Sequence, residues 1–288
     1  MYHNICLSGG GIKLLSFIGT LKYLFNEKYI FYNKIKKLIG VSAGAIISFL
    51  LNIGYTIQEL EEFATNFHFS KLLPEINSEN LLFLYGFDKN IQLNRLFTLL
   101  LKNKYNINDI TFIQLFEKTN IHLQIGISNI TDNQFELWDY NNNPHMSVIT
   151  AVSISCNLPI VYQPIKINNK LYIDGGLLNN FPVNFIPKNQ LKYTISIASD
   201  SKYPDNFNNV FEYLGKIIFI IASNNDKIRI ANFKNKLDII VIKSKDNLLN
   251  FDIDKKTIIS RIEYGFNISK KFFTKKLSNT KSTRRNSI

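Results

Sequence analysis

One serine stands in a sequence context that can turn its hydroxyl into a nucleophile. Ser42 is the centre of Gly40-Val41-Ser42-Ala43-Gly44, which fits the pattern G-x-S-x-G. A strand is predicted to end at Val41 and an apolar helix to begin at Ala43, so the serine falls at a sharp turn that exposes its Oγ. Glycines are needed on both sides because a side chain there would collide with the neighbouring strand or helix. The alternative is a plain glycine-rich turn without chemistry.

A serine hydroxyl needs a base before it attacks a carbonyl. The α/β-hydrolase order is serine, then an acid, then a histidine. Here the histidines are His3, His68, His122 and His145, and none follows His145. Ser42 also follows only two predicted strands, which is early for that fold. The base is therefore sought among the carboxylates.

Asp174 is the best candidate for this base. It ends the short predicted strand 171–173 and is followed by Gly175 and Gly176, which allow close approach of the backbone. Parallel strands place their carboxyl ends at one edge of a sheet, where α/β enzymes hold their ligands. We therefore expect Asp174 beside Ser42. The alternative is an Asp-Gly hairpin turn.

A glycine-rich loop supplies a third element. Gly9, Gly10 and Gly11 follow the predicted strand 2–7 and precede a helix, with Ile12 and Lys13 next in the chain. Such a loop turns several N–H groups toward one point, which suits an anion. The anion is either a nucleotide phosphate, as in G-x-G-x-x-G, or the oxyanion of an acyl intermediate. Leu14 replaces the last glycine of the nucleotide pattern, and no acidic residue closes the second strand, so the oxyanion is favoured.

The remaining pattern predicts a parallel sheet covered by helices. Further strands are expected at 37–41, 123–128, 134–138, 193–198 and 238–243, and helices at 43–51, 57–67, 93–101, 111–118, 147–155, 211–233 and 254–273. Asn108 or Asp109 is the expected cap of helix 111–118. No linker divides the chain. We therefore predict one domain over residues 1–275, with its motifs in 4–188, and a basic, disordered tail over 276–288.

The net charge of +12 is concentrated near the end, where no acidic residue follows Glu263 and seven basic residues lie between Lys270 and Arg285. The alternatives are a solvated end and attraction to an anionic membrane. No nucleic-acid motif accompanies the charge, so no nucleic acid is expected. No apolar run reaches the ~18 residues of a membrane span, and no secretory signal opens the chain. We expect a cytoplasmic protein that associates peripherally with membranes when active. No zinc or calcium pattern appears, so no metal or other cofactor is expected.

Taken together, SGGGIK, GVSAG and DGG, in this order, resemble the patatin-like phospholipase family. Two softer segments also resemble it. AVSISCNLPIVYQP, residues 151–164, is similar to the small-residue helix and proline loop before the aspartate, and Asn180-Phe181-Pro182 is similar to the Asn-x-Pro after it. The resemblance covers about residues 4–188 in motif and extends to about 273 in fold.

The resemblance implies a three-layer α/β/α sandwich with a mostly parallel central sheet. It also implies a lipid acyl hydrolase of phospholipids or other lipid esters, with Ser42 as nucleophile and Asp174 as proton acceptor. Gly9, Gly10 and Gly11 would form the oxyanion hole, supported by Lys13, Gly40, Gly44, Gly175 and Gly176. Leu14 departs from the small residue that the family usually has, which we expect to change packing rather than activity. The alternative is a catalytically silent lipid- or membrane-binding protein on the same fold.

Overall fold

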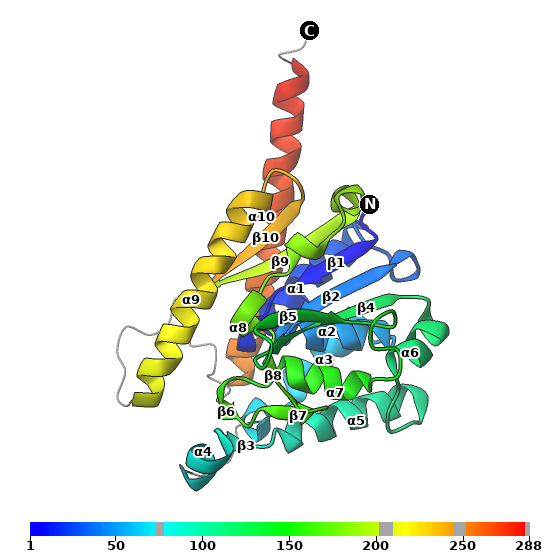
Figure 1. The fold of residues 1–288 in the computed structure, drawn as a ribbon. Coiled ribbons are helices and arrows are strands. Elements are labelled where there is room, and N and C mark those ends of the chain that lie inside the picture. The colour runs from blue at the N-terminus through cyan, green and yellow to red at the C-terminus, as the bar shows by residue number, and fades with distance from the viewer. Residues whose placement is uncertain (73–77, 202–209, 245–251, 286–288) are drawn as a thin grey trace.

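The centre of the computed structural model, which describes residues 1–72, 78–201, 210–244 and 252–285, is an eight-stranded sheet (Figure 1). Its order is β10-β9-β1-β2-β4-β8-β7, with β5 paired to β4. Five strands are parallel: β10 (Asp238–Ser244), β9 (Thr194–Ser201), β1 (Asn4–Leu7), β2 (Lys37–Val41) and β4 (His122–Asn129). The antiparallel pairs involve β5 (Gln134–Trp138), β8 (Lys170–Asp174) and β7 (Ile165–Ile167). β3 (Gly86–Asp88) and β6 (Ile160–Tyr162) form a separate pair.

Helices cover both faces of this sheet. The larger layer contains α1 (Leu14–Asn26), α2 (Ala43–Asn52), α3 (Ile57–Asn66), α5 (Ile91–Tyr105), α6 (Phe112–Thr119), α7 (Val148–Ser155) and α10 (Lys255–Arg285). α8 (Gly176–Asn179) and α9 (Val210–Phe233) lie on the other face, and α4 (Ser78–Leu84) packs on β3. Alternate residues of β1 show the two layers, since Ile5 and Leu7 lie in the larger core and Cys6 lies in the smaller one. The predicted sandwich with a mostly parallel sheet is confirmed.

Two local predictions differ from the structure. Thr111, and neither Asn108 nor Asp109, caps α6, in a capping box with Gln114. Asp109 instead accepts a hydrogen bond from the Ser147 hydroxyl at 2.7 Å. The three-residue strands β3, β6 and β7 were not predicted, because segments this short carry no readable alternation of polar and apolar residues.

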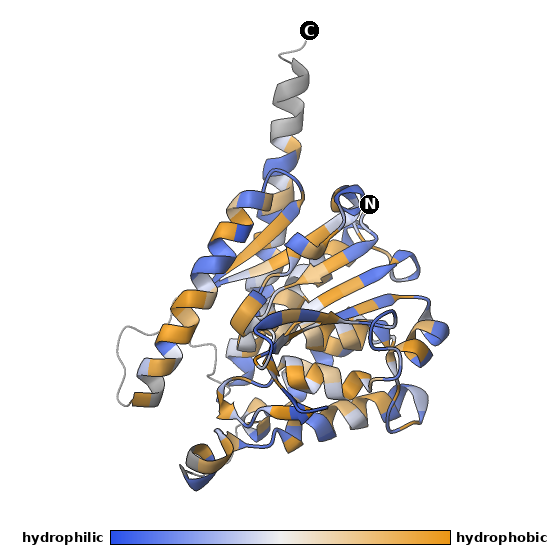
Figure 2. Cartoon of the chain, in the orientation of Figure 1, coloured by the Kyte–Doolittle hydropathy of each residue, from blue (hydrophilic) through white to orange (hydrophobic). Residues whose placement is uncertain are grey.

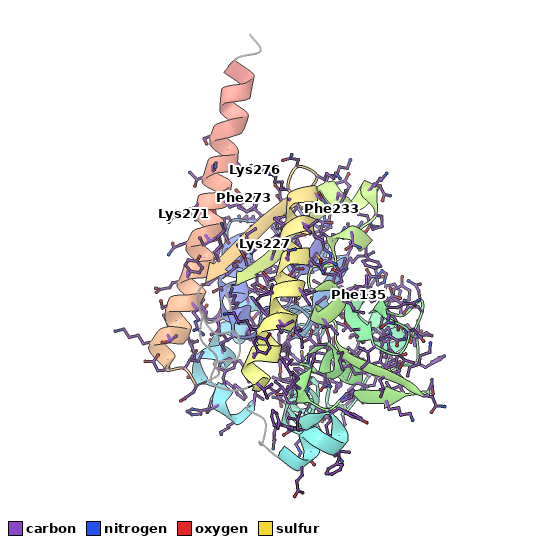
Figure 3. All side chains as sticks on the ribbon, turned by 60° about the vertical axis from the view of Figure 1, so that its left-hand side comes forward. Phe135, Lys227, Phe233, Lys271, Phe273 and Lys276 are labelled. Atoms are coloured by element: carbon purple, nitrogen blue, oxygen red, sulfur yellow. The ribbon has the colours of Figure 1, made fainter. Side chains whose placement is uncertain are left out.

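The last helix runs farther than its predicted end near Phe273. α10 continues to Arg285. The helix therefore includes most of residues 276–288, the segment expected to be a disordered tail. Packing holds its middle turns in place: Phe273 is buried and stacks on Tyr29 with ring centroids 3.9 Å apart, and Lys276 forms an ion pair with Asp238 of β10 (Figure 3). The side chains from residue 279 onward lie outside the described residues, including three of the seven basic ones.

Candidate active site

Ser42 occupies the turn between β2 and α2 in a strained backbone conformation. Its φ is 51° and its ψ is −120°, which a residue with a side chain adopts only where the surroundings enforce it. A Cβ on Gly40 would lie 2.3 Å from the Gly44 carbonyl oxygen, and one on Gly44 would lie 2.4 Å from that of Leu7. Strand, turn and helix are therefore locked together by close approach. The turn has the form of a nucleophile elbow.

The last residue of α7 and the segment directly after it hold the backbone at both candidate residues. The Ser42 N–H donates to Ser155 Oγ at 2.9 Å, and that hydroxyl donates to the Gly126 carbonyl of β4 at 2.6 Å. Two residues later, the Asn157 carbonyl accepts the Asp174 N–H at 3.0 Å. Residues 151–164 include the helix and proline loop singled out in the sequence, but their composition does not indicate which residues make these contacts. Ser155 and Asn157 are therefore positioning residues that sequence reasoning missed.

Asp174 lies level with Ser42, although not for the predicted reason. Val41 pairs with Gly126 of β4, and Asp174 pairs with Ile127, the next residue, on the same edge of that strand, because β5 pairs with both residues on the opposite edge. β8 is antiparallel to β4, so the rule that parallel strands end at one edge does not apply to Asp174. The prediction that Asp174 ends a strand parallel to the one before Ser42 was wrong. The register of two different pairings with β4 brings the serine and the aspartate to one place.

The carboxyl of Asp174 is almost completely buried, with 2% of the residue exposed. Burial raises its pKa to about 7, although hydrogen bonds from the Ser42 hydroxyl and the Gly176 N–H oppose the rise. The Gly176 N–H donates to Oδ1 at 2.6 Å. Oδ2 makes no hydrogen bond of ordinary geometry with the described residues. One carboxylate oxygen is thus held by a backbone N–H, the other is unbonded, and the Ser42 hydroxyl lies against the carboxyl group.

The glycine loop connects β1 to the short helix η1 (Gly11–Lys13). The Gly9 N–H donates to the Asn180 carbonyl at 3.1 Å and is therefore already used. Within the described ranges, no intramolecular acceptor is found for the N–H of Gly10 or Gly11. Of the three predicted glycines, Gly10 and Gly11 are therefore the ones whose N–H groups can meet an anion. Gly9 contributes by fixing the loop, because its carbonyl also accepts from the Ser199 hydroxyl at 2.8 Å.

Asn180 joins this loop to α9. Its Nδ2 donates to Asp226 Oδ2 at 2.7 Å and lies 3.4 Å from the Gly9 carbonyl. A Cβ on Gly9 would lie 2.1 Å from Asn180 Oδ1, so the loop has no room for a side chain there. Burial raises the pKa of Asp226 to about 6, against the opposing effects of Asn180 and Arg229. Nothing in the sequence pointed to Asp226, because the pattern of α9 does not show which residue meets the loop.

Lys13, predicted to support the motif, lies behind the loop. Only 1% of the residue is exposed, and its Nζ donates to the Asp200 carbonyl on β9 at 3.0 Å. The lysine therefore ties the start of α1 to the neighbouring strand. Gly175 also packs closely, since a Cβ there would lie 2.3 Å from the Gly126 carbonyl oxygen. Both residues hold the backbone around the site.

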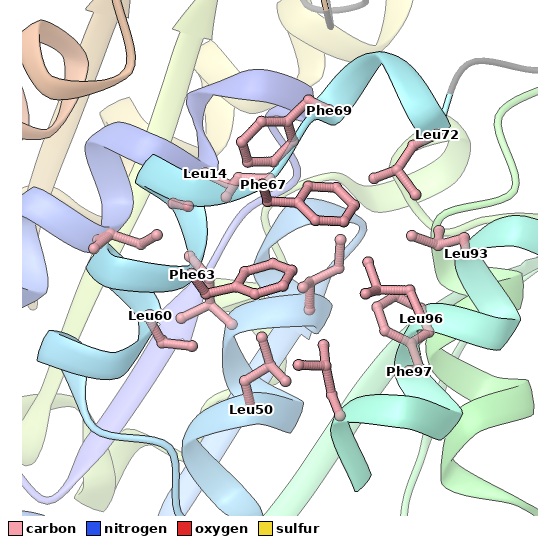
Figure 4. Close-up of a pocket in the computed structure, with 15 residues that line it drawn as sticks. Leu14, Leu50, Leu60, Phe63, Phe67, Phe69, Leu72, Leu93, Leu96 and Phe97 are labelled. Carbon is pink, nitrogen blue, oxygen red and sulfur yellow. The ribbon is translucent and has the colours of Figure 1, made fainter. Parts of the chain in front are cut away.

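An apolar cavity lies among the helices of the larger layer (Figure 4). All fifteen residues that line it are apolar. Fourteen come from α1, α2, α3, α5 and the short helix η3 (Phe69–Leu72), and Phe67 directly follows α3. Leu14 comes directly after the loop helix, and Ile46 lies one turn after Ser42; both are half-buried. Phe97, Leu93 and other buried side chains close the far side. Leu14, the departure from the family pattern, therefore forms part of this wall.

The family model of patatin-like phospholipases matches residues 5–185, a range that includes all three motifs. The chain belongs to the patatin-like phospholipase family. Over 195 residues, 65% of this chain, it is 35% identical to "Probable lipid hydrolase 463L" of Invertebrate iridescent virus 6; the match spans 64% of that relative's length. It is 29% identical to "Uncharacterized protein R571" of Acanthamoeba polyphaga mimivirus over 268 residues, 88% of this chain and 87% of the relative.

Two solved structures share the fold of this chain. VipD from Legionella pneumophila superposes with a TM-score of 0.59 at 14% sequence identity, covering 95% of this chain and 67% of VipD. ExoU from Pseudomonas aeruginosa, solved in complex with SpcU, gives a TM-score of 0.58 at 15% identity, covering 95% of this chain and 52% of the other. At such low identity these likenesses show the architecture alone. No helix among the described residues is long and apolar enough to cross a membrane.

Proposed function

We propose that this protein is a lipid acyl hydrolase that cleaves carboxylic esters through an acyl-Ser42 intermediate. The observation that carries the proposal is the placement of the Ser42 hydroxyl beside a buried carboxyl with a pKa of about 7 and one oxygen not otherwise bonded. Membership of the family supports lipid hydrolysis at the level of the family. The name of the iridescent virus relative, a probable lipid hydrolase, agrees with it.

In the proposed mechanism, Asp174 Oδ2 takes the proton of Ser42 as Oγ attacks the ester carbonyl. The tetrahedral intermediate collapses, the bond to the leaving alcohol breaks, and the alcohol takes the proton from Asp174. Water, deprotonated by the same carboxylate, then attacks the acyl carbonyl, the bond to Ser42 Oγ breaks to release a fatty acid, and Oγ takes the proton back from Asp174. A base with a pKa near the working pH is well suited to both proton transfers.

The oxyanion is proposed to lie against the N–H groups of Gly10 and Gly11. A well-placed donor of this kind typically contributes ~2.7–4 kcal/mol to transition-state stabilisation. Ala43, the first residue of α2, also places the positive end of a ten-residue helix next to the serine. These groups would stabilise the negative charge that develops on the carbonyl oxygen as Ser42 attacks.

The apolar cavity supports a substrate with an acyl chain. Its walls offer no polar lining, so an acyl chain is the part of a lipid ester that would enter it. Two of its lining residues are close in sequence to the candidate site: Leu14 comes directly after the loop helix, and Ile46 lies one helical turn after Ser42. We therefore propose phospholipids or other lipid esters as substrates, with no cofactor and no nucleic acid partner.

Peripheral contact with an anionic membrane in the cytoplasm completes the proposal. Lys270, Lys271 and Lys275 are exposed on α10, whereas Lys276 is bonded to Asp238. Each basic residue near an anionic surface adds ~1 kcal/mol of attraction. Phe273 is buried and cannot insert, while Leu277 is 58% exposed. The attraction proposed for this segment is therefore mainly electrostatic.

The proposal is tested with a phospholipid in vesicles and a soluble short-chain ester, comparing wild type with Ser42→Ala. We expect wild type to hydrolyse both and the variant neither, while circular dichroism shows that the two are equally folded. If wild type binds the vesicles but hydrolyses neither substrate, the proposal is wrong. The catalytically silent lipid-binding protein would then be the better account.

A further inference from the structure

The first half of α9 presents a row of exposed apolar side chains. Six of them are at least 38% exposed: Val210, Tyr213, Leu214, Ile217, Ile220 and Ile221. Their spacing of three and four residues places them along one side of the helix. Figure 2 shows this end of α9 as mainly apolar in colour. Contiguous apolar surface of this kind on a folded protein marks a site of contact with another molecule.

The second half of α9 packs on the smaller core of the protein. Among the side chains described from Tyr213 onward, the first that is buried belongs to Asp226. Beyond it, Ile230 and Phe233 pack against the smaller core (Figure 3). A surface helix normally turns its apolar stripe toward the core. In the first half of α9 that stripe faces outward.

The bond from Asp226 to Asn180 shows where this apolar half lies relative to the site. Because Asn180 also contacts Gly9, Asp226 is level with the glycine loop. α9 connects the parallel strands β9 and β10, so its beginning lies toward the carboxyl ends of the strands. At ~1.5 Å per residue, Ile221 and Val210 lie ~7 Å and ~24 Å beyond Asp226 along the helix. The apolar half therefore extends past the edge of the sheet that carries Ser42 (Figure 1).

The chemistry of the segment favours a lipid surface as its partner. Residues 210–223 contain only two charged side chains, Glu212 and Lys216. These fourteen residues span ~21 Å as a helix, which is less than the ~30 Å core of a bilayer. Such a segment lies in the interface rather than crossing the membrane. Lys227 is exposed one and a half turns after Ile221 (Figure 3), where a cation meets headgroup phosphates.

We propose that residues 210–222 of α9 dock into the lipid surface that contains the substrate and hold the catalytic edge against it. The inference rests on the proposed function for the nature of that surface. The link through Asp226 and Asn180 fixes the docked helix relative to the glycine loop, so docking and catalysis share one orientation. This contact is apolar and lies at the carboxyl edge of the sheet, whereas Lys276 of α10 meets Asp238 at the start of β10, at the amino edge. The electrostatic contact proposed for α10 is therefore a separate one, with a different orientation of the protein.

The test is binding to vesicles of phosphatidylcholine alone, whose zero net charge minimises any contribution from the basic residues of α10. The variant is Ile217→Lys with Ile221→Lys, and the matched control is Ile228→Lys. Ile221 is 57% exposed and Ile228 is 52% exposed, on the same side of the same helix but on either side of Asp226. We expect the double variant to bind at least ~10-fold more weakly, because two apolar side chains lose their burial. The control should bind within about twofold of wild type.

Hydrolysis of a soluble short-chain ester is measured in parallel, and all three proteins should retain it. Unchanged vesicle binding by the double variant overturns the proposal, as does an equal loss in Ile228→Lys. A concentration-dependent dimer that the double variant dissociates would also overturn it, because the surface would then belong to a second copy. Ser42→Ala should bind vesicles like wild type. The docking proposal and the hydrolase proposal can therefore fail independently.

Discussion

Two buried aspartates near the glycine loop, Asp174 at the end of β8 and Asp226 in α9, differ in their partners more than in their burial. Burial raises the pKa of both, to about 7 and about 6. Asp226 accepts hydrogen bonds from the Asn180 amide at 2.7 Å and from Arg229 at 3.3 Å. Asp174 has Gly176 on one oxygen and, within the described residues, no ordinary hydrogen bond on the other. Burial raises the pKa of both carboxyls, but only Asp174 combines an unbonded carboxylate oxygen with a neighbouring serine hydroxyl, and we therefore propose Asp174 and not Asp226 as the base.

The largest expected effect separates these two carboxylates directly. Asp174→Asn should lower kcat on a soluble short-chain ester by ~10²–10⁴, the usual cost of losing a general base. Asp226→Asn should cost less than ~10-fold, because the backbone bond between Gly9 and Asn180 and the bond from Ser199 remain. Circular dichroism controls for folding. Similar losses in the two variants would show that the difference in partners has no catalytic meaning.

The second prediction sharpens the comparison through pH. Because Asp174 must be ionised to act as a base, the rate on a soluble ester should rise about tenfold per pH unit below about pH 7 and level off above it. The folded state binds the extra proton between about pH 3.8 and about pH 7, so this group makes the free energy of unfolding fall as pH rises through that window. Asp174→Asn should remove this contribution in chemical unfolding measured at several pH values. A rate already constant from pH 5 upward would contradict the assignment.

A smaller effect is expected on the preference of the enzyme for acyl-chain length. If the acyl chain enters the cavity, Leu14→Ala should shift preference toward longer chains by several-fold, since each buried methylene contributes ~0.8 kcal/mol. A series of esters of increasing chain length measures kcat/KM. Leu99→Ala on α5 is the control, because Leu99 is 58% exposed and does not line the cavity. An identical chain-length profile in both variants would place the acyl chain elsewhere.

The smallest effects are expected at the histidines, because the proposed base is the carboxylate of Asp174 and no histidine is needed for proton transfer. His3, His68, His122 and His145 should each tolerate alanine with less than ~10-fold loss of kcat. The Nε2 atom of His122 lies 2.9 Å from Asp139 Oδ2. His122 pairs with Lys37, which is at the end of β2 away from Ser42. Excess EDTA should also leave the rate unchanged. Collapse of activity in a folded histidine variant would restore a triad.

Local sequence patterns were sufficient to predict the turn at Ser42 and most of the helices and strands. Strand pairing was not accessible in this way, so the antiparallel direction of β8 and the register that aligns Asp174 with Ser42 were missed. Ser155 and Asp226 were missed because their partners are distant in sequence. The apolar spacing of α9 also resembles that of a core helix. Only the packed structure shows that Ile220 and Ile221 face outward.

The central claim is that Ser42 is a nucleophile activated by its surroundings. The most direct test is labelling with a fluorophosphonate probe, which reacts with activated serines, followed by mass spectrometry of the modified peptide. We predict one adduct, on Ser42, in wild type and in Leu99→Ala, much slower labelling in Asp174→Asn, and none in Ser42→Ala. Equal labelling of Ser42→Ala, or an adduct on a different serine of wild type, would contradict the account.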